Sequence, residues 1–255
     1  MTDKIVLVGA HGRMGAMLIA RAAERDIYVT GTDMPLVPDT LAPACADAAL
    51  AILCVPAAVF EETVRSVCPY LPPKAVLCDI TSVKEIPLLQ MEKHWSGPVV
   101  GTHPLFGPAP LEAEDKTVAI VPGRGAKTEH LALVREFFLA IGCHVFETTA
   151  REHDQAVARI QGMNFITTLA YFALLADKDE ILPFITPSFR RRMEAARKML
   201  TEDAELFTGI FNANPHSLEA IRQYRQILNL AASGDVELLC ERAKRWWRKD
   251  RHSAQ

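Results

Sequence analysis

The stretch KIVLVGAHGRMG, residues 4–15, decides how the chain folds. A short apolar run of β type leads directly into a loop with Gly9, Gly12 and Gly15. A helical pattern begins within this loop, at Arg13. Glycines at such a junction let the backbone turn tightly, approach a pyrophosphate and pack a helix against a strand, while the first amides of the helix face negative charge. The stretch therefore predicts a dinucleotide site made by Gly9, Gly12, Arg13, Met14 and Gly15.

The spacing of this loop departs slightly from the usual fingerprint. Ala10 stands where the first glycine is expected, and Gly9 comes one place earlier. A turn of somewhat different shape is therefore expected. The alternative interpretation is a glycine-rich turn that binds no ligand.

Outward from this loop, short apolar runs alternate with helical patterns up to about residue 150. Such alternation is typical of a parallel sheet flanked by helices. We therefore predict an α/β dinucleotide-binding domain of Rossmann type over residues 1–150. The expected strands are KIVLVG, IYVTGTD, ALAILCVP, AVLCDIT, PVVGTHP, TVAIVPG and CHVFETT.

The texture of the sequence changes near residue 150. Runs of β-branched residues almost disappear, and apolar residues recur three and four positions apart, as at Val157, Ile160 and Met163. This period indicates helices, and proline or glycine breaks divide them into about four or five. We predict an all-α domain over residues 151–255 that binds substrate and forms a homodimer, because helices without a sheet partner must bury their remaining apolar stripes somewhere.

Two further strand ends complete the expected cofactor site. Asp33 ends the second expected strand, where a carboxylate accepts hydrogen bonds from the adenosine ribose and repels a 2′-phosphate. NAD is thus favoured over NADP, although Thr32 does not exclude NADP and Asp33 could be a solvated turn residue. Val55 and Pro56 close the third expected strand at the sheet edge where ligands bind in open α/β folds.

Polar residues follow the next two expected strands. The segment after AVLCDIT contains Thr81, Ser82 and Lys84, and PVVGTHP brings His103 to the end of its strand. Both ends are expected to converge on the nicotinamide, with Thr81 on the cofactor side. A histidine there could take the proton of a substrate hydroxyl, and a serine or lysine could orient that hydroxyl or a carboxylate. A surface histidine with no role is the alternative.

Composition narrows the class of partner. The chain has 255 residues and a formal net charge of −3, which gives no electrostatic case for binding nucleic acid. The N-terminus has no signal-peptide pattern, and no run reaches the roughly 18 apolar residues of a membrane span, so a soluble cytoplasmic protein without a membrane partner is expected. The six cysteines form no C-x-x-C pair, which predicts buried free thiols and no metal site.

Four segments together resemble one family. VGAHGRMG, DITSVKEIPLLQM, GTHPLFGP and EHDQAVARIQ, in this order and spacing, are similar to the prephenate dehydrogenases, especially the dehydrogenase portion of bifunctional chorismate mutase–prephenate dehydrogenases. The resemblance runs from about Lys4 to Trp247, and DxxSVK together with HPxFG is specific. Because no mutase helix precedes the loop and no regulatory domain follows, a free-standing dehydrogenase is expected.

The resemblance implies a reaction and roles for several residues. The reaction is the oxidative decarboxylation of prephenate to 4-hydroxyphenylpyruvate with NAD, on the route to tyrosine. His103 matches the catalytic histidine that accepts the hydrogen bond of the substrate hydroxyl, and Ser82 matches a serine that contacts both. His153 matches a supporting histidine at the domain junction, Lys84 has a structural or electrostatic role, and Gln161 is shared with the bifunctional relatives.

The chain also departs from the family pattern. Phe165 stands where a second histidine is usual, and Lys198 stands where an arginine holds the substrate carboxylate. Arg190 matches another family arginine, so Arg190, Arg197 or Lys198 is expected to bind the carboxylate unless this basic run is a solvated helix face. A lysine can do so only as a point charge, without the two-pronged geometry of arginine.

These departures leave alternatives open. Arogenate, which carries an amino acid side chain in place of the keto acid, is the nearest competing substrate, and a dual-specificity cyclohexadienyl dehydrogenase is included in this alternative. A hydroxyacid or imine reductase on the same scaffold is another. A non-catalytic NAD-binding sensor is the last, although intact Ser82 and His103 argue against it.

Overall fold

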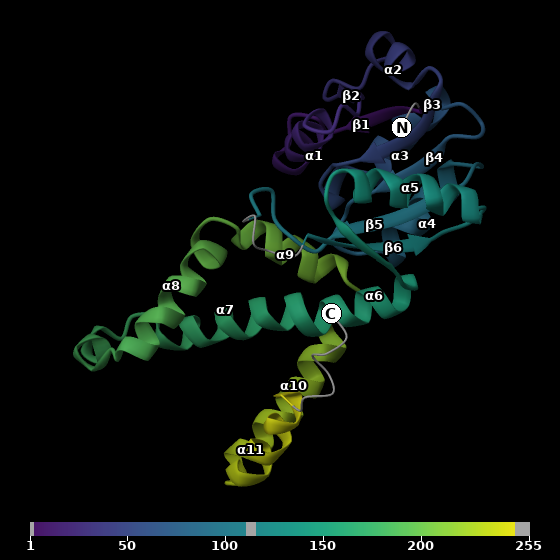
Figure 1. Ribbon diagram of the computed structural model, residues 1–255. Helices are drawn as coiled ribbons and strands as arrows, with labels where there is room; N and C mark the ends of the chain where they lie inside the picture. The colour runs from purple at the N-terminus through teal and green to yellow at the C-terminus, as the bar shows by residue number, and fades with distance from the viewer. Residues whose placement is uncertain (1–2, 111–115, 248–255) are drawn as a thin grey trace.

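The computed structural model describes residues 3–110 and 116–247. Its N-terminal half is a seven-stranded sheet in the order β2-β1-β3-β4-β5-β6-β7, covered by helices (Figure 1). All seven predicted strands are present. They are β1 (Lys4–Val8), β2 (Val29–Thr32), β3 (Ala48–Leu53), β4 (Val76–Asp79), β5 (Val99–Pro104), β6 (Thr117–Pro122) and β7 (His144–Glu147).

Alternation along the strands builds two cores, one on each face of the sheet. In β1, Val6 and Val8 belong to one buried cluster, while Ile5 and Leu7 belong to the other. The first cluster packs against α2 (Pro38–Cys45), α3 (Phe60–Val67) and α4 (Glu85–His94). The second packs against α1 (Arg13–Ala23) and α5 (Thr128–Ala140). Strands apolar on both faces are typical of a sheet covered on both sides, so the expected α/β fold is confirmed.

One pairing differs from the expected parallel sheet. The strands from β1 to β5 are parallel to their neighbours, but β6 runs antiparallel to β5. A parallel connection needs a long crossover that usually contains a helix, and the described residues between these two strands form none. β7 is again parallel to β6, to which it is connected through α5.

The C-terminal half is helical over its described residues. α6 (Ala150–Val157) leads through a π-helical turn (Ala158–Gly162) into α7 (Met163–Leu175), and together they form a nearly continuous rod (Figure 1). α8 (Pro187–Thr201) starts near the tip of α7 and diverges from it toward α9 (Ala204–Ala213), which lies near the sheet half (Figure 1). α10 (Ser217–Ala232) and α11 (Val236–Lys244) form a second arm. Short 3₁₀ segments span Ala57–Val59, Cys68–Tyr70, Asp179–Phe184 and Arg245–Trp247.

The described residues from 150 onward contain six α-helices, against the four or five predicted. Predicted breaks are observed at Thr186–Pro187, Asn214–Pro215 and Ser233–Gly234, but α7 ends at Leu175, and the predicted break at Leu182–Pro183 lies inside a 3₁₀ segment. The chain also turns at Glu202 and Asp203, between α8 and α9, where no proline or glycine marks the break. The cysteine expectation holds for four of the six, since Cys54 is half-buried and Cys240 is exposed. Within the described ranges, no helix is long and apolar enough to cross a membrane.

Candidate active site

The glycine loop follows β1, which lies between β2 on one side and β3 on the other, so the order of the strands reverses at this point. Gly9 has a φ of +91°, and a Cβ atom there would lie 2.3 Å from the carbonyl oxygen of Cys54. A Cβ atom on Gly15 would lie 2.2 Å from the carbonyl oxygen of Gly9. The tight turn is therefore made by Gly9, as its earlier position suggested, and ligands in open α/β folds bind at such a switch point.

Asp33 follows β2 and holds the glycine loop in place. Its two carboxylate oxygens accept hydrogen bonds from the backbone N–H groups of His11 (2.8 Å) and Met34 (2.7 Å). The backbone N–H groups of Gly9 and Ala10 also bond to the carbonyl oxygen of Thr32. The aspartate is thus tied to the loop beside which an adenosine ribose would lie. Val55 and Pro56 follow β3 at the same edge of the sheet.

Arg13 and Met14 begin α1 at the loop. The Arg13 guanidinium lies 3.3 Å from the carboxylate of Asp203, the residue before α9. This ion pair joins the cofactor side of the sheet half to the helical half.

Lys84 and Asp79 form a buried ion pair next to the ends of β4 and β5. Lys84 is 0% exposed, and its Nζ donates to Asp79 Oδ2 (2.5 Å) and to the carbonyl oxygen of Thr102 (2.6 Å). The Asp79 carboxylate also accepts the N–H groups of Thr81 (2.9 Å) and Thr102 (3.3 Å). Burial lowers the pKa of Lys84, and the negative charge of Asp79 opposes that shift. Such a pair persists only because its remaining hydrogen bonds are satisfied.

Two histidines meet in front of this pair. His103 in β5 and His153 in α6 are 3% and 4% exposed, and Nδ1 of His103 lies 2.9 Å from Nε2 of His153. Nδ1 of His153 in turn lies 2.7 Å from Oδ1 of Asp154. Among the described residues, none hydrogen-bonds to Nε2 of His103. One histidine from each half therefore joins a single hydrogen-bonded chain that ends in a carboxylate.

Burial decides the protonation of His103. Removal from water lowers the pKa of His103 well below its ordinary value of 6.5, and the neighbouring His153 and Lys84 lower it further. His103 is consequently neutral at pH 7, the state in which an imidazole can accept a proton.

Asp154, the last group of this hydrogen-bonded series, also bonds to other parts of the protein. Its Oδ1 accepts the N–H of Lys84 (2.7 Å) and its Oδ2 accepts the N–H of Glu85 (2.9 Å), at the start of α4. Its carbonyl oxygen accepts a hydrogen bond from Asn214 Nδ2 (2.8 Å). Asp154 and Asp79 were not singled out from the sequence. The available signals were the aspartate next to His153 in EHDQ and the aspartate at the end of an apolar strand.

The other predicted site residues, Thr81, Ser82 and Gln161, differ in their contacts. Thr81 is buried, and its hydroxyl group bonds within the protein, to Asp79 Oδ2 and the carbonyl oxygen of Val83. Ser82 is half-buried and follows β4, next to the strand that carries His103. Gln161 lies in the π-helical turn between α6 and α7, a kind of irregularity that is frequent at functional sites.

The three predicted carboxylate-binding residues all lie on α8. Arg190, Arg197 and Lys198 are exposed, and no described side chain forms an ion pair with any of them. No described contact joins them to the histidine pair, so their role stays a prediction. Phe165, which replaces the usual histidine, is buried and stacks on Phe207 with ring centroids 5.6 Å apart.

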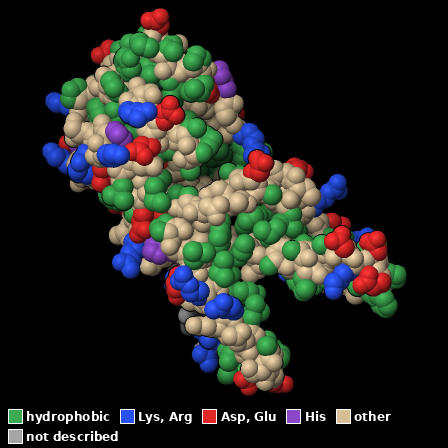
Figure 2. Space-filling model, turned by 180° about the vertical axis from the view of Figure 1, so that it is seen from behind, with side chains coloured by type: hydrophobic (Ala, Val, Ile, Leu, Met, Phe, Trp, Pro, Cys, Tyr) green, Lys and Arg blue, Asp and Glu red, His purple; other side chains and the backbone are tan. Residues whose placement is uncertain are grey.

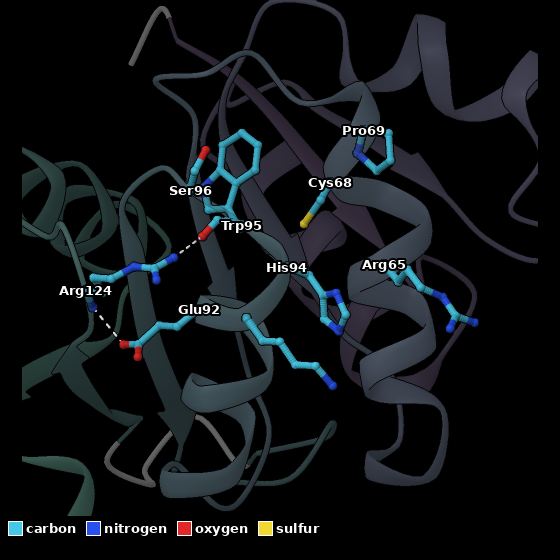
Figure 3. Close-up of a pocket in the computed structure, with 9 residues that line it drawn as sticks. Arg65, Cys68, Pro69, Glu92, His94, Trp95, Ser96 and Arg124 are labelled. Atoms are coloured by element: carbon cyan, nitrogen blue, oxygen red, sulfur yellow. Dashed lines mark hydrogen bonds between the residues drawn. The ribbon is translucent and has the colours of Figure 1, made fainter.

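A separate hollow of about 510 Å³ lies between the C-terminal parts of α3 and α4 (Figure 3). Its lining includes Arg65, Trp95 and Arg124, and the backbone N–H of Arg124 donates to Glu92. Because α4 ends here just before β5 begins, the hollow lies at the opposite end of the strands from His103. It contains none of the predicted site residues.

A glycine loop at a switch point, an aspartate after the second strand and polar strand ends beside them define the class of dinucleotide-binding proteins. The comparisons make this assignment more specific. The model for "Prephenate dehydrogenase, nucleotide-binding domain" matches residues 21–147. Over these residues the chain is similar to the prephenate dehydrogenase family.

Two curated relatives match nearly the whole chain. The T-protein of Enterobacter agglomerans is 29% identical over 228 residues, which are 87% of this chain and 60% of that protein. The T-protein of Haemophilus influenzae is 29% identical over 229 residues, which are 88% of this chain and 59% of that protein. The chain thus spans about 60% of the length of these relatives.

Solved structures share the fold. Prephenate dehydrogenase from Aquifex aeolicus, in complex with hydroxyphenyl propionate and NAD+, superposes with a TM-score of 0.77 at 19% identity, covering 96% of each chain. Synechocystis arogenate dehydrogenase superposes with a TM-score of 0.74 at 23% identity, covering 95% of this chain and 96% of the other. The order of the sheet half and the helical half is therefore an architecture already seen in this family.

Proposed function

We propose that this chain is an NAD-dependent dehydrogenase that converts prephenate to 4-hydroxyphenylpyruvate by oxidation and loss of carbon dioxide. The observation that carries the proposal is His103, a buried neutral histidine at the end of β5, hydrogen-bonded through Nδ1 to His153. The similarity to T-proteins and to a prephenate dehydrogenase bound to NAD+ and hydroxyphenyl propionate supports the choice of reaction.

The residues present fit NAD. Gly9 and Gly15 let the loop pack closely against Cys54 and against itself, where Cβ atoms would collide with carbonyl oxygens. The compact turn places the loop directly before the first amides of α1, which can face a pyrophosphate. Asp33 offers a carboxylate to the ribose hydroxyls and would repel the 2′-phosphate of NADP. When it is bound, NAD supplies the acceptor for the hydride.

The chain's own residues handle the substrate hydroxyl and carboxylate. In the proposed reaction His103 accepts the hydroxyl proton as hydride leaves the same carbon, and Ser82 orients that hydroxyl. Carbon dioxide leaves from the opposite ring position. Arg190, Arg197 or Lys198 would bind a substrate carboxylate, which requires α8 of this chain or of a second copy to lie over the site.

Arogenate is the second candidate substrate. The buried stack of Phe165 on Phe207 puts an apolar ring where the family usually has a histidine. At this position the protein would distinguish the keto acid side chain of prephenate from the amino acid side chain of arogenate. A protein of Methanocaldococcus jannaschii, 28% identical over 210 residues, is described as a probable arogenate/prephenate dehydrogenase. A single site can thus be associated with both substrates.

A homodimer is part of the proposal. The arm formed by α7 and α8 exposes Leu174, Leu182 and Phe184, which is 80% exposed. A second copy that covers this arm would remove apolar surface from water. Sedimentation of the purified chain measures this directly, and a monomer at micromolar concentration would contradict it.

The test of the activity uses the purified chain with prephenate or arogenate and with NAD or NADP, followed by the absorbance of the reduced cofactor. Prephenate with NAD should give the highest kcat/KM. His103→Asn should lower kcat by roughly a hundredfold to ten-thousandfold, the usual share of general-base catalysis, and leave NAD binding unchanged. A folded, NAD-binding His103→Asn variant with wild-type kcat would remove His103 from the mechanism. No turnover of either substrate by the wild type would overturn the proposed function.

A further inference from the structure

We propose that Asp154 and His153 are positioning residues that hold His103 in the ring form with its proton on Nδ1, so that Nε2 is free to accept the substrate proton. The inference rests on the proposed function for its catalytic consequence. The ring forms themselves can be measured without any turnover.

The argument starts at the carboxylate. An ionised carboxylate only accepts hydrogen bonds, so the 2.7 Å contact between Asp154 Oδ1 and His153 Nδ1 requires a proton on that nitrogen. Two backbone N–H groups, of Lys84 and Glu85, also donate to this carboxylate. Both oxygens of Asp154 therefore act as acceptors.

The same logic passes through both rings. A neutral His153 with its proton on Nδ1 has a lone pair on Nε2. The 2.9 Å contact with His103 then requires the proton of His103 to be on Nδ1. A neutral His103 in this form has its lone pair on Nε2. Exchanging the carboxylate for a donor would reverse both assignments, and removing it would leave neither ring form fixed.

Charged groups also lie on the elements that pack around this pair. The buried cation Lys84, with its partner Asp79, lies behind His103 on the side of β4 and α4. The carboxylate of Glu85 in α4 lies 3.3 Å from Nε2 of His216, in the turn before α10. Burial, His153 and the cation of Lys84 all lower the pKa of His103 and disfavour a positive charge on that ring.

The arrangement also gives the accepted proton a path. When Nε2 of His103 takes the hydroxyl proton, the ring becomes positively charged, and its Nδ1 proton can move to Nε2 of His153. His103 is then neutral again with its proton on Nε2, and the positive charge lies on His153 beside the Asp154 carboxylate. The charge that develops during the reaction is thus stabilised by a carboxylate two groups away from the substrate.

Nuclear magnetic resonance of the chain labelled with ¹⁵N in its eight histidines tests the ring forms directly. Long-range ¹H–¹⁵N correlations distinguish Nδ1–H, Nε2–H and doubly protonated rings. His103→Asn and His153→Gln identify the two signals by their loss. At pH 7.5 both rings should carry a single proton on Nδ1. A proton on Nε2 of either ring, or a doubly protonated His153, would overturn the proposal.

Asp154→Asn tests the role of the carboxylate. Its amide can donate to His153 Nδ1, so the His103 proton should move to Nε2 and kcat should fall by roughly a hundredfold to ten-thousandfold. His153→Gln can still accept from His103 and should cost less than Asp154→Asn, with the His103 proton kept on Nδ1. Glu85→Gln, a neighbouring carboxylate outside this chain of bonds, should change neither the ring forms nor kcat.

The outcomes separate the two proposals. If Asp154 only anchors the start of α4, Asp154→Asn would lower the Tm and leave the His103 ring form unchanged, and the positioning role would be wrong. If Asp154→Asn does not fold, the wild-type ring forms still decide. A wild type without activity toward prephenate or arogenate, but with both protons on Nδ1, would refute the proposed function and keep the positioning inference.

Discussion

The two halves of the molecule bury their apolar side chains in different ways. The sheet half encloses two large clusters, one on each face, with most members 0–2% exposed. Beyond residue 150 only five described apolar residues are fully buried, namely Val157, Ala158, Phe165, Ala196 and Ala220. Figure 2 shows hydrophobic side chains along both projecting arms of the helical half.

This difference explains which site residues the single chain can position. Residues of the sheet half are held by their own cores and by the buried Lys84–Asp79 pair. In the helical half, His153 and Asp154 are buried because they pack on the sheet half, whereas Arg190 and Lys198 lie on an exposed helix. A side chain gains a defined position only where other atoms enclose it.

The largest expected difference between the two halves is the loss of stability when a large apolar side chain is truncated. Phe137→Ala, in the core under α5, should lower the free energy of unfolding by about 3–5 kcal/mol. Phe184→Ala, at the exposed tip between α7 and α8, should change it by less than about 0.5 kcal/mol in dilute protein but weaken self-association. Urea unfolding and sedimentation measure the two effects. An unchanged dimer in Phe184→Ala would move the interface to another part of the helical half.

Removal of a lysine charge should also destabilise the sheet half much more than the helical half. Lys84→Met leaves the Asp79 carboxylate buried without its cation and should cost about 3–5 kcal/mol in thermal or urea unfolding. Lys178→Met, an exposed lysine of the helical half, should stay within about 0.5 kcal/mol. A loss below about 1 kcal/mol for Lys84→Met would contradict the stabilising role of this ion pair.

Cofactor choice tests whether the sheet half alone determines NAD binding. Asp33→Ala removes charge-assisted hydrogen bonds, so KM for NAD should rise roughly tenfold to a hundredfold, and the preference over NADP should narrow. Initial rates with each cofactor measure this. Equal use of both cofactors by the wild type would show that the assignment of Asp33 is wrong.

Substrate anchoring tests the helical half. Arg190→Ala and Lys198→Ala should raise KM for prephenate by roughly tenfold each, with a smaller fall in kcat, because a charge that grips the substrate acts equally in the ground and transition states. Steady-state kinetics separate the two constants. If neither variant changes KM, Arg197 becomes the next candidate.

The smallest expected effect is a shift in the pH dependence of kcat/KM, set by His103 at the junction of the two halves. Because the pKa of His103 is lowered, the neutral base persists below pH 6.5, and kcat/KM should fall only when the pH drops through that lowered value. Rates measured from pH 5 to 8 with NAD in excess give the position of this acid limb. A limb at or above 6.5 would contradict the burial of His103 in the working enzyme.

Local signals were sufficient for much of the molecule. All seven strands, the glycine loop and the positions of His103, Ser82 and Asp33 at strand ends could be predicted, because alternating polarity and glycine position act over a few residues. The domain boundary at residue 150 stays a prediction, although the last strand ends at Glu147 and helices follow from Ala150. The missed break at Asp203 lacks any strong local breaker.

Sequence by itself determined the sheet, the loop and the resemblance to prephenate dehydrogenases, because these depend on short patterns that any copy of the segment carries. Only the tertiary structure decided that His103 bonds to His153, fifty residues away, and that Asp154 stands behind them both. It also decided that Lys84 is buried against Asp79 and that β6 runs antiparallel to β5. Hydrogen bonds and ion pairs of this kind form only where folding brings distant groups within about 3 Å and removes water from them, and no spacing along the chain encodes that distance.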